Sequence, residues 1–293
     1  MLSIALQQGI NGLVVGSLYV LVALGLTLIY GVLVQINFAH ADIVTIGAFV
    51  AYFVTPLPGG SYFAGIAAAA IVGGLLGWLL NAAIFSPLRK SGSELLPLIA
   101  TIGVSIMLQN LMLTVLGPIP YAFSTSYSNS VIRFAGIFVT VQNLLIIVVS
   151  TLTIGLLYAF MKYTYTGKAL RAVSQDRETA GLMGINPNFV IMLTFVIASA
   201  LAGMGGAMLA PVLVLTPFAG TSVIVKAFAI VIIGGFGNIE GTIIAGFIVG
   251  FIESFTTQFL DPGLIDIVVF ALLLLTLAVR PTGLIAESRE ENV

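Results

Sequence analysis

The chain has 293 residues, of which 59% are hydrophobic and only 7% are Asp, Glu, Lys or Arg, and its mean hydropathy is +1.18. A water-soluble domain carries about a quarter charged residues, so most of this surface must face lipid. The net charge of −1, with ten scattered basic residues, excludes a nucleic-acid-binding surface, and zero cysteines exclude disulfides and thiolate chemistry.

Apolar segments recur along the whole chain. They lie at about 9–33, 38–56, 62–85, 95–116, 136–161, 189–215, 223–236, 241–258 and 264–279. Only helices satisfy their own backbone hydrogen bonds in lipid, so residues 1–293 are predicted to form one all-α integral membrane domain, a polytopic helical bundle of about eight transmembrane segments. The run 223–236 is too short to cross comfortably, and "GGFGNIEG" follows it, so we expect a broken helix or hairpin at 223–258.

The connections carry the basic residues and thereby set the orientation. Eight of the ten lie in three places: Arg89 and Lys90; Lys162, Lys168, Arg171 and Arg177; Arg280 and Arg289. Short cytoplasmic loops are rich in Lys and Arg, so these connections are predicted to be cytoplasmic. Counting back through three segments from residue 86 places the N-terminus outside, whereas a broken second segment would place it inside.

Polar residues near the start of segment 38–56 allow two interpretations. Asn37 and His40 are three residues apart and share a helix face, and Asp42 follows closely. If the break before them lies at the membrane surface, they form a helix start capped by Asn37. If it lies deeper, they line a cavity and are candidates for the translocation path, because ionisable groups in lipid are costly.

Three further polar residues lie in the broken region 223–258. Asn238 and Glu240 again allow a cap or a place in the path, and the acidic residue suits the helix start at 241. Glu253 lies well inside its segment and is expected to pair with another helix, to bond Gln109 or Asn110, or to face the path.

Small residues gather in two other segments. The stretches "GGLLG" at 73–77 and "ASALAGMGGAMLA" at 198–210 predict close helix packing, with pore lining as the alternative.

The connection 162–188 concentrates charge in a chain that has little of it. Asp176 can accept hydrogen bonds from first-turn backbone N–H groups, Glu178 suits the positive helix end, and Gly184 can end the helix in a left-handed conformation. A helix of about two turns is therefore predicted at 177–183. Two isolated turns are marginal in water, so this helix is expected to dock on another subunit.

The same stretch resembles the cytoplasmic signature of ABC importer permeases. Glu178, Thr179, Ala180 and Gly184 occupy the spacing Glu-Ala-Ala followed by Gly, with Thr179 as the departure, while the later Ile-x-Leu-Pro half is absent. Five stretches together resemble the permease family of branched-chain amino acid ABC transporters: "LIYGVLVQINFAHADIVTIGAF", "RAVSQDRETAGLMGIN", "LTFVIASALAGMGGAML", "KAFAIVIIGGFGNIEGTIIAGFIVGFIES" and "AVRPTGL". Ala41 and Asp42 stand where that family usually has Gly and Glu.

The resemblance implies a multi-pass subunit of a prokaryotic cytoplasmic-membrane importer, with a second permease, two cytosolic ATPase subunits and an extracytoplasmic binding protein. Its ATPase-coupling residues would be Asp176, Arg177, Glu178, Ala180 and Gly184. Independently, the chain has no G-x-x-x-x-G-K-[ST] phosphate loop, so ATP and Mg²⁺ are expected on the partner ATPases. One His without Cys supplies no typical transition-metal site, and no cofactor is expected in this chain.

Branched-chain or related small amino acids are the expected substrates, with urea or short-chain amides as the alternative. An ion-coupled secondary transporter would instead use Asp42, Glu240 or Glu253, and an intramembrane enzyme would act alone. Neither of these two classes accounts for a capped, charged helix at 177–183.

Overall fold

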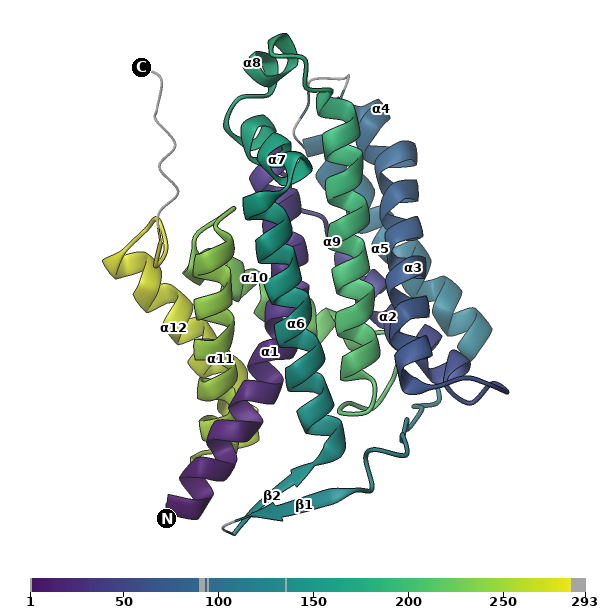
Figure 1. Cartoon of the computed structure of the whole chain (residues 1–293), viewed down its shortest axis with the longest axis vertical. Helices are drawn as coiled ribbons and strands as arrows, with labels where there is room; N and C mark the ends of the chain where they lie inside the picture. The colour runs from purple at the N-terminus through teal and green to yellow at the C-terminus, as the bar shows by residue number, and fades with distance from the viewer. Residues whose placement is uncertain (1, 90–92, 94, 135, 286–293) are drawn as a thin grey trace.

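The computed structural model describes residues 2–89, 93, 95–134 and 136–285. Figure 1 shows an elongated helical bundle with α8 at one end and the N-terminus and a β-hairpin at the other. The elements in chain order are α1 (Leu2–Leu33), α2 (His40–Val54), α3 (Tyr62–Leu80), a π-helical turn (Asn81–Phe85), α4 (Ser86–Arg89), α5 (Leu95–Leu116), β1 (Val131–Phe134), β2 (Ile137–Thr140), α6 (Val141–Tyr163), α7 (Tyr165–Gln175), α8 (Arg177–Leu182), α9 (Pro187–Leu209), α10 (Ala219–Gly234), α11 (Ile239–Phe259), a 3-10 turn (Pro262–Leu264) and α12 (Ile265–Val279).

The predicted all-helical membrane architecture is confirmed. Among the described residues, seven helices are long and apolar enough to cross a membrane, and the shorter α2 and α10 are also apolar. The predicted break at 223–258 lies between α10 and α11. Four boundaries or elements were wrong. The span predicted from 9 starts at Leu2, and the span predicted from 136 starts at Val141 because 137–140 pairs with 131–134. The span predicted to 215 ends at Leu209, and α7 was not predicted.

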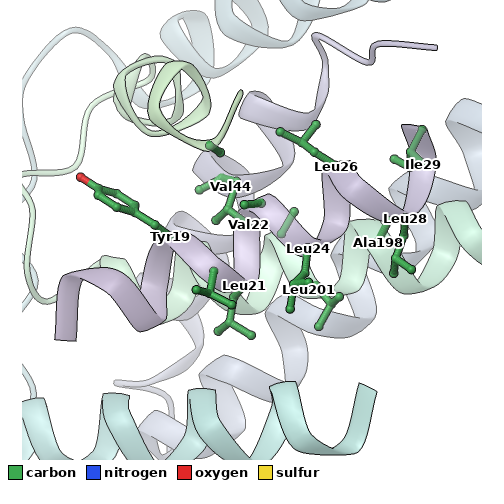
Figure 2. Close-up of a cluster of buried hydrophobic side chains, with 14 of the residues drawn as sticks. Tyr19, Leu21, Val22, Leu24, Leu26, Leu28, Ile29, Val44, Ala198 and Leu201 are labelled. Atoms are coloured by element: carbon green, nitrogen blue, oxygen red, sulfur yellow. The ribbon is translucent and has the colours of Figure 1, made fainter. Parts of the chain in front are cut away.

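Helix α1 is the centre of the bundle, since 89% of its most apolar window is buried. Figure 2 shows its side chains, among them Leu21, Leu24 and Ile29, reaching toward different neighbouring helices, with Ala198 and Leu201 of α9 against them. A helix that is apolar on all sides is suited to this enclosed position.

The two predicted small-residue stretches pack against each other, one on α3 and one on α9. A Cβ on Gly73 or Gly77 would overlap the backbone of Ser199 or Phe195. The same kind of close contact joins α1 to α11, where Gly250 lies against the Gly16 backbone. In lipid, where apolar side chains gain nothing by leaving the solvent, such close van der Waals packing holds helices together.

The short helices α2 and α10 both begin inside the bundle. The Nε2 atom of His40 lies 3.3 Å from the Val22 carbonyl oxygen. Val22 is eleven residues before the end of α1, or about 16 Å at 1.5 Å per residue. The Gly220 N–H donates to Thr45 Oγ1 at 2.9 Å, and the Phe38 and Phe228 ring centroids are 5.8 Å apart, so α10 runs antiparallel to α2.

Helices α1–α3 and α9–α11 therefore form an inverted repeat. Each triplet has a long helix, a short helix starting at mid-depth, and a third helix. The third helix of each packs most extensively on the long helix of the other, α3 on α9 and α11 on α1. Inverted repeats with broken helices at the midplane are characteristic of transporters.

The positive-inside rule predicts that the end of the bundle that bears α8 faces the cytoplasm, and we call it the cytoplasmic end. Helices α4, α7 and α8 gather there, opposite the N-terminus and β1–β2 (Figure 1). They bring Arg89, Lys168 and Arg171 to that end, which agrees with the external N-terminus expected from the sequence. Lys90 and Arg289 lie outside the described residues.

Candidate functional site

The connection between α6 and α9 contains two helices, α7 and α8. Helix α7 buries Leu170 and Val173 on its inner face and packs on α1, α6 and α9. The Thr164 side chain caps it by accepting from the Gly167 N–H at 3.0 Å. Gly167 lies so close to the Phe160 carbonyl that a Cβ would overlap it. These contacts hold α7 against the bundle and set the position from which α8 projects.

Helix α8 has the termini that the sequence predicts. The Asp176 Oδ1 atom accepts from the backbone N–H groups of Glu178 at 2.8 Å and Thr179 at 3.0 Å. The hydrogen bond from the Thr179 side chain, supported by these backbone bonds, lowers the pKa of the Asp176 carboxyl group. Gly184 has φ +85°, and the Ile185 N–H reaches back to the Ala180 carbonyl oxygen at 3.1 Å, which closes the helix.

Two apolar side chains form the tip of this projection. Leu182 and Met183 are 88% and 79% exposed, although they lie between charged and polar residues at the cytoplasmic end. Of the predicted coupling residues, Ala180 is buried, while Asp176, Arg177 and Glu178 are exposed. Sequence analysis missed the tip residues, because apolar residues attract no notice in so apolar a chain.

The break before α2 lies deep in the bundle. Asn37 and His40 are 1% and 0% exposed, and the Asn37 Oδ1 atom accepts from the Ala39 N–H at 3.1 Å. This bond closes the turn before α2, whereas the N-cap position of the helix is Ala39, which makes no side-chain cap hydrogen bond, so the expected cap by Asn37 was wrong. The void beside Asn37 is only about 10 Å³, too small for a substrate, so this form of the chain is closed here.

Each residue of this cluster retains a buried polar atom. Among the described residues, Asn37 Nδ2, His40 Nδ1 and Asp42 Oδ2 have no hydrogen-bond partner. Ser105 and Gln109 of α5 lie beside the Asp42 carboxyl group. We call Asn37, His40 and Asp42 the unpaired cluster. Buried polar groups in proteins are normally bonded, so each of these orphaned atoms at the start of α2 can gain a bond in another state or with a ligand.

Glu253 belongs to a different cluster, on the far side of α10. Its carboxylate accepts from Lys226 Nζ at 2.9 and 3.0 Å and from the Tyr19 hydroxyl at 2.9 and 3.1 Å. Asp266 Oδ1 lies 3.9 Å from the same Lys226 nitrogen. We call Tyr19, Lys226 and Glu253 the paired cluster. Of the alternatives that the sequence left open for Glu253, the structure shows a pair with another helix. Lys226 is the single lysine of the apolar run 223–236, and this could have indicated it as the partner of Glu253 from the sequence.

Asn238 and Glu240 lie near the cytoplasmic end, apart from both clusters. The Asn238 side chain caps α11 by accepting from the Gly241 N–H at 2.8 Å, so the cap is the amide and not the acid. Glu240 is exposed in the first turn and accepts from the Tyr158 hydroxyl at 3.0 Å. The six residues predicted for the path thus fall in three separate places.

No group of three His, Asp or Glu side chains within the described ranges is close enough to hold a metal ion.

Comparison with known proteins covers nearly the whole chain. Residues 9–277 match the family described as branched-chain amino acid transport system / permease component. The high-affinity branched-chain amino acid transport system permease protein LivH of Escherichia coli (strain K12) is 34% identical over 302 residues, covering 98% of this chain and 97% of that protein. The permease protein BraD of Pseudomonas aeruginosa is 35% identical over 307 residues, covering 98% of each. A probable permease LivH of Methanocaldococcus jannaschii is 29% identical over 85% of this chain and 80% of its own. No solved structure matches the chain significantly.

Proposed function

Because this chain belongs to the family of branched-chain amino acid transport permeases, we propose that it moves branched-chain amino acids across the cytoplasmic membrane as one permease subunit of an ATP-driven importer. The chain is a multi-pass membrane protein and a permease, so the ATP-hydrolysing subunits are separate chains. Its partners in this proposal are a second permease, two cytosolic ATPases that bind ATP and Mg²⁺, and an extracytoplasmic binding protein.

The observation that carries the coupling part is the tip of α8. Leu182 and Met183 are almost fully exposed, on a helix whose two ends are held by Asp176 and Gly184. Exposed apolar side chains at the end of a capped helix suit a groove on a protein partner. Burying them there is favourable, and little conformational entropy is lost on binding because the permease already orders the helix. The ATPase is the partner that this end of an importer subunit must contact.

Movement of α8 would reach the membrane through its neighbours. Helix α7 packs on α1, α6 and α9, and Asn186 caps α9 shortly after Gly184 by accepting from the Phe189 N–H at 3.3 Å. Helix α9 passes the unpaired cluster, since the Ala198 carbonyl and the His40 ring both lie against Gly25. The connection 162–188 is therefore the proposed coupling element, and Asn37, His40 and Asp42 are the proposed residues of the path.

The test replaces the two apolar side chains of the tip with polar ones. The importer is purified from cells that produce all its subunits, with Leu182→Ser and Met183→Ser together. We expect the ATPase to be lost on purification and ATP-driven uptake of L-leucine to fall at least about tenfold, a change of about 1.4 kcal/mol. The control Leu182→Met with Met183→Leu keeps the apolar tip and should behave as wild type.

Two further measurements distinguish the alternative substrate class and the alternative energy source. Uptake of urea or acetamide with no uptake of leucine would replace the substrate class. Leucine uptake that stops when ion gradients are removed, with ATP intact, would make the chain ion-coupled. Normal ATP-driven leucine uptake by the double variant Leu182→Ser with Met183→Ser would refute the coupling assignment.

A further inference from the structure

A cavity opens at the cytoplasmic end of the bundle, away from both polar clusters. It measures about 330 Å³ and lies between α1, α6, α7 and the start of α11. This is at the lower end of the volumes that small-molecule sites have, about 300–1,000 Å³. Its size suits one small metabolite.

The lining of this cavity combines both signs of charge with an apolar wall. Lys162 of α6 and Arg171 of α7 contribute positive charge, and Glu240 of α11 contributes negative charge. Leu28, Val32 and Met161 supply apolar surface on the same cavity.

The three charged side chains line one cavity without forming an ion pair among the described residues. In the part of the chain that the structure describes, the ion pairs are Lys226–Glu253 and Lys226–Asp266, so Lys162, Arg171 and Glu240 form none. Tyr158 stands between two of them: its hydroxyl donates to Glu240 Oε1 at 3.0 Å, and Lys162 Nζ lies 5.5 Å from its ring centroid. Opposite charges held apart around a cavity are complementary to a ligand that carries both signs.

We propose that this cavity binds the zwitterion of an aliphatic α-amino acid from the cytoplasm. The carboxylate faces Lys162 and Arg171, where a guanidinium can bind it through two hydrogen bonds. The ammonium group faces Glu240, and the side chain lies on Leu28, Val32 and Met161. A phospholipid headgroup also carries charge at this depth, but an anionic one would be repelled by Glu240, and the cavity volume suits a single amino acid.

Occupancy of this cavity would slow further import. Arg171 lies on α7, one turn and a half before the Asp176 cap of α8, whereas Lys162 and Glu240 belong to α6 and α11. A bound zwitterion joins α7 to these two helices and stabilises the arrangement in which it fits, at the expense of others. The inhibitory role rests on the proposed function, whereas the binding site itself rests on the cavity.

The first experiment measures binding directly. The importer without its binding protein is placed in phosphatidylcholine nanodiscs, and L-leucine is titrated in by calorimetry. We expect saturable binding that 4-methylpentanoate, which lacks the ammonium group, and 3-methylbutylamine, which lacks the carboxylate, do not reproduce. Arg171→Gln and Glu240→Gln should each raise the Kd at least about tenfold.

The matched control is Lys168→Gln. Lys168 is an exposed basic residue on the same helix α7, and it does not line the cavity. This variant should bind leucine with unchanged Kd. Equal loss in Lys168→Gln and Arg171→Gln would overturn the site, as would leucine binding that disappears when phosphatidylethanolamine or phosphatidylglycerol is added to the nanodisc, which would make the occupant a lipid.

The second experiment measures the consequence in proteoliposomes that contain the complete importer. Leucine loaded on the ATPase side should slow wild-type uptake at least about fivefold, relative to unloaded vesicles, and should slow Arg171→Gln much less relative to its own unloaded rate. Uptake that internal leucine does not slow overturns the inhibitory role and leaves the permease assignment intact. Leucine binding without any leucine uptake would overturn the permease assignment and support the cavity.

Discussion

The two polar clusters inside this bundle differ in how completely their atoms are bonded. In the paired cluster, Lys226 bonds both oxygens of Glu253, and the Tyr19 hydroxyl bonds them as well. In the unpaired cluster, Asn37, His40 and Asp42 each keep a buried atom without a partner among the described residues. A satisfied network holds three helices in one arrangement, whereas an unsatisfied one gains free energy when the arrangement changes or a ligand arrives. We therefore expect the first to act as a clamp, and the second is the proposed working site.

The largest expected effect is on the clamp. Glu253→Ala leaves the Lys226 ammonium group, whose side chain is only 14% exposed, without its main partner, so the free energy of unfolding should fall by an amount approaching the about 3–5 kcal/mol that breaking a buried ion pair costs. The measurement is thermal or denaturant unfolding in detergent, followed by circular dichroism. The double variant Lys226→Met with Glu253→Met removes both charges and should recover most of the loss. If the double variant is as unstable as Glu253→Ala, the cluster is not an ion-pair clamp.

A smaller loss is expected where α10 closes over the unpaired cluster. Gly220 lies against the Ala41 carbonyl at the first turn of α2, and a side chain there would overlap it. Gly220→Ala should therefore force the two helix starts apart and cost about 1–3 kcal/mol of stability. Gly103→Ala in α5 is the matched control, because a Cβ there meets nothing within 4 Å. Equal stability of the two variants would show that the contact between α2 and α10 is not tight.

The working site should respond in activity and hardly in stability. Asp42→Asn keeps the shape of the side chain and removes the charge, so the free energy of unfolding should change by less than about 1 kcal/mol. ATP-driven leucine uptake should nevertheless fall about tenfold or more. Leu108→Ile, on the neighbouring helix α5, controls for general sensitivity. A large stability loss with unchanged uptake per folded molecule would place Asp42 with the clamp.

The smallest effect concerns the Asp176 cap, outside both clusters. Its folded-state pKa is lowered, so its contribution to α8 is present above the unfolded pKa of about 3.9 and is lost as the pH falls through the folded value. Hydrogen exchange of residues 177–183 should therefore be constant from pH 8 to pH 5 after correction for the intrinsic rate, and protection should be lost only in more acidic solution. Thr179→Val should move that loss to higher pH. Loss of protection between pH 6 and 7 would contradict the cap.

Local features of the sequence were sufficient for much of the fold. Segment lengths indicated the spans, and Asp176 and Gly184 indicated both ends of α8, because caps and left-handed glycines act within a few residues. Segment 95–116 agrees with α5 to the residue. The β-hairpin was missed because Gly136 and a single arginine gave little sign of pairing, and α7 was missed because its apolar face is short.

Only part of the candidate site could be predicted from the sequence. Asn37, His40 and Asp42 were recognised as candidates, since polar residues in an apolar span are conspicuous. Their depth was open, because the sequence does not say whether residues 34–39 run along the surface or turn back into the bundle. Lys226 and Glu253 lie on different helices, and neither segment by itself indicates that these helices are neighbours.

The sequence by itself determined that this chain resides in lipid and where α8 begins and ends, and it predicted which end faces the cytoplasm, because composition, charge and capping act locally. Only the tertiary structure decided that α2 and α10 start at mid-depth, that the small residues of α3 face those of α9, and that Lys162, Arg171 and Glu240 surround one cavity. Each of these depends on which helices lie side by side, and that choice is made by packing among many segments at once.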